Sequence, residues 1–189
     1  MILFPERKLA WVHVPKTGGT TICDAFVRAM GMEDVDVLDG SQSRFHERGM
    51  HAGFGKWSPP EGWRALMFVR DPWSRVWSGY HSMGRKEPFS EFVLADVWGQ
   101  CGHNRVTYAP CSAFDPKGVA TDVFRFEEYA EGVSAVYGRL GLEGPASHLN
   151  SRDYDAGGWR SAYTPEMAEV IRVVFAEDFE RYGYDPGAV

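Results

Sequence analysis

The stretch of sequence that decides the fold is Trp-Val-His-Val-Pro-Lys-Thr-Gly-Gly-Thr-Thr, at residues 11–21. The apolar run Leu9–Val14 predicts a buried strand, and the residues after the threonines predict a helix. Between them, Gly18 and Gly19 let backbone N–H groups turn toward an anion, and the positive end of the following helix attracts the same charge. Lys16 adds a full positive charge. These residues predict a strand, an anion-binding loop and a helix.

The order of residues in this loop differs from that of the common ATP-binding loop. In the Walker A motif the lysine follows the glycines, whereas Lys16 precedes Gly18 and Gly19. This order disfavours an ATPase or an ordinary kinase. The loop alone leaves one alternative open, which is a glycine-containing turn between strand and helix with a chance lysine.

Composition and charge narrow the class of protein. The chain has 189 residues, of which 44% are hydrophobic, and this predicts a single folded domain over residues 1–189. The net charge of −6 disfavours a nucleic-acid-binding protein. Because the sequence has no apolar run of membrane-spanning length and no signal-peptide pattern, we expect a cytoplasmic protein without a membrane partner.

The three cysteines, Cys23, Cys101 and Cys111, do not form the pattern of a disulfide framework. Pairing of Cys101 with Cys111 stays open, although the reduced state fits a cytoplasmic protein better. No spacing of cysteine and histidine indicates a zinc site, and we expect no metal.

Apolar periodicity divides the chain into alternating strands and helices. We predict strands at residues 9–14, 34–38, 64–69 and 121–126. We predict helices after the glycine loop, after Asp71, over residues 88–98 and 129–140, and as one last helix from Thr164 to Tyr182. This alternation predicts an α/β fold with a central, mainly parallel sheet flanked by helices. Ligands of such folds bind at the carboxyl ends of strands, where Lys16 and Arg70 are expected.

A second candidate anion site begins at Arg70, between the strand at residues 64–69 and the helix after it. Ser74 and Ser78 are four residues apart, so they share one face of that helix. We expect this face to lie away from the apolar stripe and outside the core, where Arg70 and Ser78 can converge on one anion. The alternative is an ion pair between Arg70 and a carboxylate. Two such sites indicate a nucleotide with phosphates at both ends of its ribose.

The two motifs together resemble those of the sulfotransferases, in the branch of the carbohydrate 2-O- and chondroitin-type enzymes. The resemblance rests on Pro15–Thr21, on Val69–Arg75 and on Ser78–Tyr80. Weaker likenesses follow in order and extend over nearly the whole chain, at Arg125–Glu127, His148–Ser151, Tyr163–Glu166 and Glu177–Tyr184. The resemblance implies a three-layer fold similar to that of the P-loop NTPases.

The resemblance also implies a donor, 3′-phosphoadenosine 5′-phosphosulfate (PAPS), and residues that bind it. The first motif would hold the 5′-phosphosulfate through Lys16, Thr17, Gly18, Gly19, Thr20 and Thr21. Arg70 and Ser78 would hold the 3′-phosphate, and the later loop adds Ser151 as a cofactor-binding residue. The implied reaction is in-line transfer of a sulfuryl group to an acceptor hydroxyl or amine, in which Lys16 stabilises charge on the leaving phosphate oxygen.

A hydroxyl acceptor needs a general base, for which histidine is the usual residue. Met50-His51-Ala52 resembles the segment that carries the catalytic histidine in the family, so we predict His51 as the base and His46 as the second choice. The alternative is that His51 is only a loop residue. Of the other histidines, His13 is expected to pack within its strand and His81 to lie on the surface.

The acceptor and the partners are less defined. We expect a carbohydrate or small-molecule acceptor, no nucleic acid, no membrane and no metal, and the sequence does not indicate an oligomeric state. The alternative function is a P-loop-type small-molecule kinase that uses ATP, which the position of Lys16 disfavours.

Overall fold

The computed structural model describes residues 1–31, 53–55, 57–82, 86–96, 109–143 and 157–189. The chain divides into two compact units. The first comprises Met1–Val69 and Phe114–Ser151, and the second comprises Arg70–Ala113 and Arg152–Val189. The single domain expected over residues 1–189 stays a prediction.

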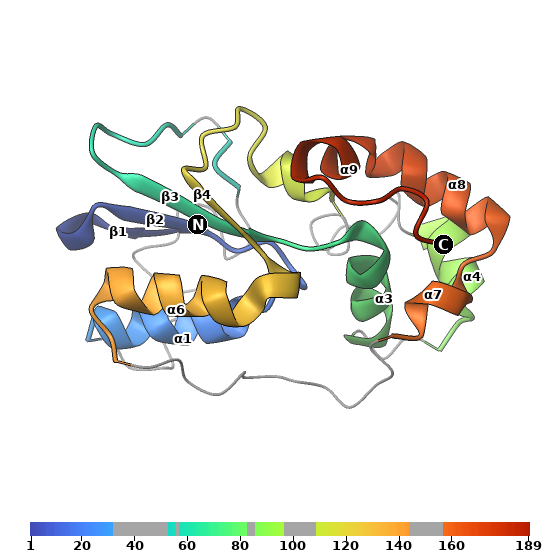
Figure 1. Cartoon of the computed structure of the whole chain (residues 1–189), viewed down its shortest axis with the longest axis horizontal. Helices are drawn as coiled ribbons and strands as arrows, with labels where there is room; N and C mark the ends of the chain where they lie inside the picture. The colour runs from blue at the N-terminus through green and yellow to red at the C-terminus, as the bar shows by residue number, and fades with distance from the viewer. Residues whose placement is uncertain (32–52, 56, 83–85, 97–108, 144–156) are drawn as a thin grey trace. The chain divides into compact units, whose positions relative to one another are not determined.

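In its described residues, the first unit contains a four-stranded sheet in the order β1-β2-β3-β4 (Figure 1). Its strands are β1 (Ile2–Phe4), β2 (Leu9–Val12), β3 (Arg64–Val69) and β4 (Asp122–Arg125). β1 pairs antiparallel with β2, whereas β2, β3 and β4 are parallel. The carboxyl ends of β2, β3 and β4 therefore lie at one edge of the sheet. This topology confirms the predicted α/β fold with a mainly parallel sheet flanked by helices.

The strands follow the predicted pattern, except that β1 is additional, β2 ends early, and β4 covers Asp122–Arg125 instead of the predicted residues 121–126. β3 has the predicted bounds, but β2 ends at Val12 instead of Val14, and the Val14 carbonyl accepts a hydrogen bond from the Thr17 hydroxyl. β1 was not expected, because it has only three residues before a proline turn, η1 (Pro5–Arg7). The strand predicted at residues 34–38 lies outside the described residues.

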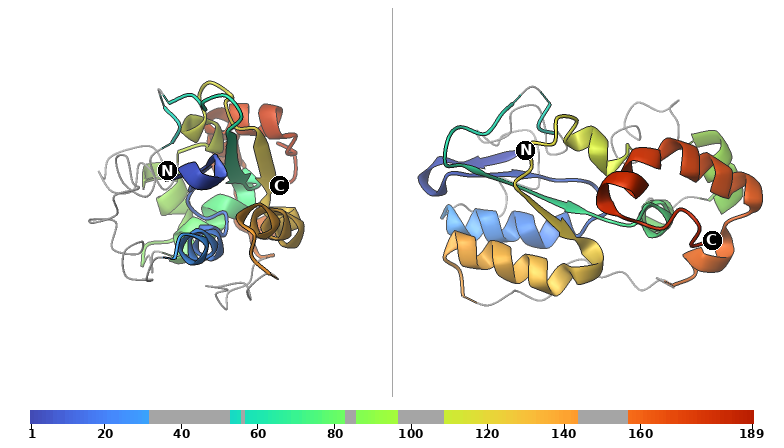
Figure 2. Two further views of the ribbon diagram at one scale, coloured as in Figure 1. Left: turned by 90° about the vertical axis from the view of Figure 1, so that its left-hand side faces the viewer. Right: turned by 45° about the horizontal axis from the view of Figure 1, so that its top comes forward.

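Helices α1 (Gly19–Ala29) and α6 (Tyr129–Leu140) lie side by side on one face of this sheet (Figure 2). α1 follows the glycine loop, and α6 follows β4 after a short 3₁₀ turn, η4 (Phe126–Glu128). The apolar side chains of both helices join those of the strands in one core. Gly132 lets α6 approach the sheet closely, because a Cβ at this position would lie 2.7 Å from the Phe68 ring.

The described residues of the second unit are mainly helical. The elements are α3 (Pro72–Ser82), α4 (Phe89–Glu91), the π-helical stretch η2 (Phe92–Asp96), α7 (Trp159–Ala162), α8 (Pro165–Val174) and α9 (Ala176–Tyr182), and the 3₁₀ turn η3 (Cys111–Phe114) leads into the first unit. Trp73 is central to the core of the second unit. Its indole N–H donates to the carbonyl of Asp185 at 3.0 Å, and the Tyr163 hydroxyl donates to the Trp73 carbonyl at 2.7 Å.

No helix in the described ranges is both long enough and apolar enough to span a bilayer.

The prediction of one continuous last helix is wrong. The helix breaks at Phe175, which has φ −99° and ψ 18° and separates α8 from α9. Both Phe175 and Phe179 are buried, at 0% and 5% exposure. Neither glycine nor proline marks the break, and both rings belong to the buried core of the second unit. The helix start was predicted correctly, since the Thr164 hydroxyl accepts a bond from the Met167 N–H at 3.3 Å.

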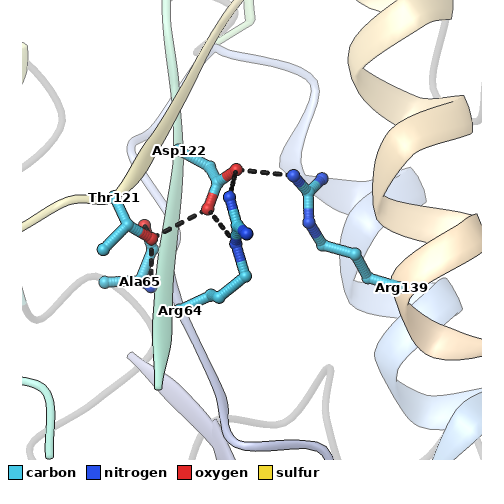
Figure 3. A network of polar contacts seen from close by, with 5 residues as sticks. All are labelled: Arg64, Ala65, Thr121, Asp122 and Arg139. Atoms are coloured by element: carbon cyan, nitrogen blue, oxygen red, sulfur yellow. Dashed lines mark hydrogen bonds and ion pairs between the residues drawn. The ribbon is translucent and has the colours of Figure 1, made fainter. Parts of the chain in front are cut away.

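A charged network joins β3, β4 and α6 (Figure 3). The Arg64 guanidinium donates to both carboxylate oxygens of Asp122 at 2.8 Å, and Arg139 donates to the same carboxylate at 2.5 Å. The Thr121 hydroxyl donates to it at 2.8 Å. Burial raises the pKa of the Asp122 carboxyl, but the bonds from Arg64 and Thr121 and the charge of Arg139 outweigh this and hold the pKa below its usual value. The Asp122 carboxylate thus links the sheet to α6 through its bond with Arg139.

Replacing Asp122 by asparagine should lower the free energy of unfolding at pH 7 by about 1–2 kcal/mol, because the amide loses the charge that both arginines bind. Since the folded-state pKa is lowered, the contribution of the carboxylate is complete above its unfolded pKa of about 3.9 and disappears as the pH falls through the folded-state value. Urea unfolding at pH 7 and at pH 3 checks this. The exposed pair of Glu169 with Arg172 supplies a control in Glu169→Gln. A deficit in Asp122→Asn that is the same at both pH values would contradict the assignment.

Candidate functional site

The loop between β2 and α1 contains two residues with left-handed backbone. Lys16 has φ +69° and Gly18 has φ +79°. Glycine adopts this region freely, whereas an L-residue such as lysine pays about 1–2 kcal/mol for it. The surrounding loop therefore imposes the conformation of Lys16, and strain of this kind is concentrated at functional sites.

Two threonine hydroxyls of the loop bond within the protein. Thr17 is 1% exposed, and its Oγ1 donates to the Val14 carbonyl at 2.8 Å. Thr21 is fully buried, and its side chain hydrogen-bonds to Tyr129. Lys16, Gly18 and Thr20 are partly exposed. The loop is therefore held from inside by its threonine hydroxyls, while these three residues stay partly accessible to solvent.

Close packing explains why Gly18 and Gly19 are glycines. A Cβ on Gly18 would lie 2.7 Å from Cζ of Tyr129, and one on Gly19 would lie 3.0 Å from Cε1 of His13 and nearer to other atoms of that ring. The His13 ring also stacks on Trp11, with 5.2 Å between centroids, so it is packed as expected, although β2 ends one residue before it. The loop backbone is held between His13 and Tyr129.

The electrostatic environment of the loop favours an anion. α1 begins at Gly19, with Gly18 as its N-cap residue, so no side chain caps the helix, and its first turn contains no acidic residue. The N–H groups of a first helical turn have no acceptor within the helix and form the positive end of its dipole. Together with the Lys16 ammonium, they make this loop suited to a phosphate or a similar oxyanion.

The second predicted site begins with Arg70, the residue after β3. Arg70 Nε donates to the Ser74 hydroxyl at 3.0 Å, and this hydroxyl donates to the Asp71 carbonyl at 3.2 Å. The Asp71 carboxylate accepts a bond from the Ser74 N–H at 3.2 Å, as expected for the residue that caps α3. The first turn of α3 therefore holds the arginine side chain in a defined orientation.

The serine face of α3 is buried, which corrects the expectation that it lies outside the core. Ser74 is 8% exposed and Ser78 is 6% exposed, and Arg70 is 7% exposed. The apolar face, with Trp73 and Val76, is buried as well. A polar stripe normally marks the solvent side of a helix, but the first two turns of α3 are enclosed on both faces.

A buried polar cluster supports the backbone at Arg70. Asp178 is fully buried and accepts the backbone N–H groups of Cys111 and Ser112, at 2.6 and 2.8 Å. The backbone of Arg70 hydrogen-bonds to the Cys111 sulfur. Burial raises the pKa of the Cys111 thiol to about 12, although the charge of Arg75 opposes this. The thiol, which is free, therefore stays protonated and unreactive.

Some predicted residues fall outside the described part of the chain. These are His51, His46 and Ser151, and also Cys101. Among the described histidines, His81 at the end of α3 is half-buried, and its ring contacts Trp77 edge-on with 4.2 Å between centroids. Burial lowers the pKa of His81, so its imidazole is neutral at physiological pH.

Tyr129 is a residue of the loop environment that sequence reasoning missed. It is the first residue of α6, and its hydroxyl donates to the Gly18 carbonyl at 2.6 Å. The two residues are 111 positions apart in the chain. A tyrosine at the start of a helix carries no local signal of such a contact.

The two candidate sites offer the Lys16 ammonium, the Arg70 guanidinium and the backbone N–H groups at the start of α1. These are cations and hydrogen-bond donors, which bind and stabilise oxyanions. In the portion of the chain that the structure describes, no three or more histidine, cysteine or acidic side chains come together as metal ligands. A model of the sulfotransferase family matches residues 1–185. No curated protein and no solved structure matches the chain.

Proposed function

Because the chain belongs to the sulfotransferase family, we propose that it transfers a sulfuryl group from PAPS to a hydroxyl or amine of a carbohydrate or small-molecule acceptor. The observation that carries the proposal is the loop before α1. It holds Lys16 in a strained conformation ahead of the glycines, at a helix start that has no side-chain cap. An oxyanion bound there would meet one full positive charge and the first N–H groups of α1.

The proposed donor contacts follow from what each side chain already does. Residues 16–21 would bind the 5′-phosphosulfate. Since the hydroxyls of Thr17 and Thr21 bond within the protein, these two residues would contribute backbone N–H groups. Arg70 and Ser78 would bind the 3′-phosphate, and the bond from Arg70 to Ser74 orients the guanidinium in advance. Ser151 is proposed as a further contact, on the resemblance alone.

The proposed reaction is an in-line displacement at sulfur. A bond forms between the acceptor oxygen or nitrogen and sulfur while the bond from sulfur to the 5′-phosphate oxygen breaks, and 3′-phosphoadenosine 5′-phosphate (PAP) leaves. The acceptor proton passes to a base, for which we propose His51, with His46 as the second candidate. Lys16 and the loop N–H groups would stabilise the charge that develops on the departing phosphate oxygen. No metal takes part in this proposal.

The remaining parts of the proposal concern the cellular location, the partners and the class of acceptor. The cytoplasmic location, the lack of a nucleic-acid or membrane partner and the choice between a carbohydrate and a small-molecule acceptor stay predictions. They rest on the sequence composition and on the family resemblance.

Calorimetric titration with nucleotides tests the identity of the donor. We expect PAP to bind in the absence of Mg²⁺, because lysine, arginine and backbone N–H groups supply the positive charge that a metal would otherwise provide. ATP with Mg²⁺ should bind at least roughly tenfold more weakly, since it has no 3′-phosphate for Arg70 to contact. Preference for ATP with Mg²⁺ would favour the kinase alternative instead.

A further inference from the structure

Tyr129 makes two contacts with the loop before α1. Its hydroxyl donates a hydrogen bond of 2.6 Å to the Gly18 carbonyl. Its ring occupies the space next to Gly18, where a Cβ would lie 2.7 Å from Cζ and 2.9 Å from the hydroxyl oxygen. One side chain of α6 thus fixes both the position and the direction of this glycine.

The direction of the Gly18 carbonyl determines the direction of the next N–H group. The peptide bond between Gly18 and Gly19 is planar and trans, so its C=O and its N–H point in opposite directions. With the carbonyl directed at Tyr129, the Gly19 N–H is directed away from α6. Gly19 is the first residue of α1, so its N–H belongs to the group that has no acceptor within the helix.

Glycine needs such a restraint because its backbone rotates freely. Gly18 has φ +79°, and glycine adopts positive and negative φ about equally well. A flip of this peptide would present a carbonyl to a bound anion instead of an N–H. The hydrogen bond from Tyr129 opposes this flip.

The tyrosine is itself held in place. Thr21 is fully buried in α1, and its side chain hydrogen-bonds to Tyr129. Burial raises the pKa of the Tyr129 phenol, and this hydrogen bond opposes the increase only in part. The phenol therefore keeps its proton and remains a donor to Gly18 across the physiological pH range.

We infer that Tyr129 is a positioning residue that holds the Gly18–Gly19 peptide with its N–H directed at the 5′ end of the donor. The inference rests on the proposed function for the identity of the donor. Its physical content, an N–H fixed for an oxyanion, is independent of that identity.

The test compares two tyrosines of the same helix. Tyr129→Phe keeps the ring beside Gly18 and removes only the hydroxyl. Tyr137→Phe is the matched control, because Tyr137 is 1% exposed and its hydroxyl has no hydrogen-bond partner among the described residues. Inorganic pyrophosphate is the probe, and the amide resonance of Gly19 in NMR titrations is the readout.

We expect pyrophosphate to shift the Gly19 resonance of the wild-type protein and to bind roughly five- to tenfold more weakly to Tyr129→Phe. Tyr137→Phe should match the wild type. Melting temperatures report folding separately, so a role limited to stability would lower the melting temperature without changing the dissociation constant. Equal binding by Tyr129→Phe and the wild type would overturn the inference, and so would a wild-type Gly19 resonance that does not respond.

A parallel titration with PAP separates this inference from the proposed function. If the wild-type Gly19 resonance responds to pyrophosphate but not to PAP, the assignment of the donor is wrong and the positioning role of Tyr129 stands. If it responds to both but Tyr129→Phe binds as tightly as the wild type, the donor assignment stands and the positioning role is wrong.

Discussion

Replacing Lys16 by methionine should reduce kcat/KM for PAPS by roughly 100- to 1,000-fold, the range found when one donor to a developing oxyanion is removed. Methionine is an unbranched side chain only one atom shorter than lysine and is also an L-residue, so the strain at φ +69° is unchanged. Melting temperature should therefore stay close to that of the wild type. Steady-state kinetics with labelled PAPS measures the effect.

Lys8 provides the control for this substitution. It is an exposed lysine of the same unit whose backbone is also left-handed, with φ +52°, and it precedes β2 whereas Lys16 follows it. Lys8→Met places methionine in the same kind of backbone and removes the same charge from the protein. It should retain wild-type kinetics. If both variants lose activity equally, the effect arises from net charge or backbone strain and the role given to Lys16 is wrong.

Replacing Asp178 by alanine should lower the free energy of unfolding by about 3–5 kcal/mol. The carboxylate is fully buried and accepts the N–H groups of Cys111 and Ser112. Its removal leaves both donors inside the protein without their acceptor. Urea unfolding at pH 7 measures the change.

Glu177 is the matched control for Asp178. It is the preceding residue of α9, and its side chain is 63% exposed in a pair with Arg181 at 3.5 Å. Glu177→Ala should cost less than about 1 kcal/mol, as expected for a surface ion pair. A similar loss in the two variants would show that the buried bonds of Asp178 do not stabilise the second unit in the way described.

Local patterns in the sequence predicted the elements that are marked by an unbroken apolar run or by regular helical spacing. The strand at Arg64–Val69 and the helix at Tyr129–Leu140 have the predicted bounds, because unbroken apolar runs and helical spacing determine them. The cap at Asp71 and the start at Thr164 were also predicted, since capping depends on neighbouring residues. The glycine loop was located from residues 11–21 alone.

Contacts between residues that are far apart in the sequence could not be predicted from such local patterns. Tyr129 and Gly18 are 111 positions apart, and Asp178 and Cys111 are 67 apart. The break at Phe175 and the burial of Ser78 likewise have no signal in the local spacing of residues. The sequence therefore predicted where the glycine loop and Arg70 follow their strands, and the structure adds the side chains that contact them. Their roles in binding the donor stay predictions.

The most direct test of the central claim is transfer of label from PAPS. The purified protein is incubated with PAPS that carries radioactive sulfur and with panels of carbohydrate and small-molecule acceptors, and Lys16→Met serves as the blank. The account predicts a labelled acceptor and an equal amount of PAP with the wild type, and none above background with the variant. A panel in which no acceptor is sulfated, together with phosphorylated products from labelled ATP, would contradict it.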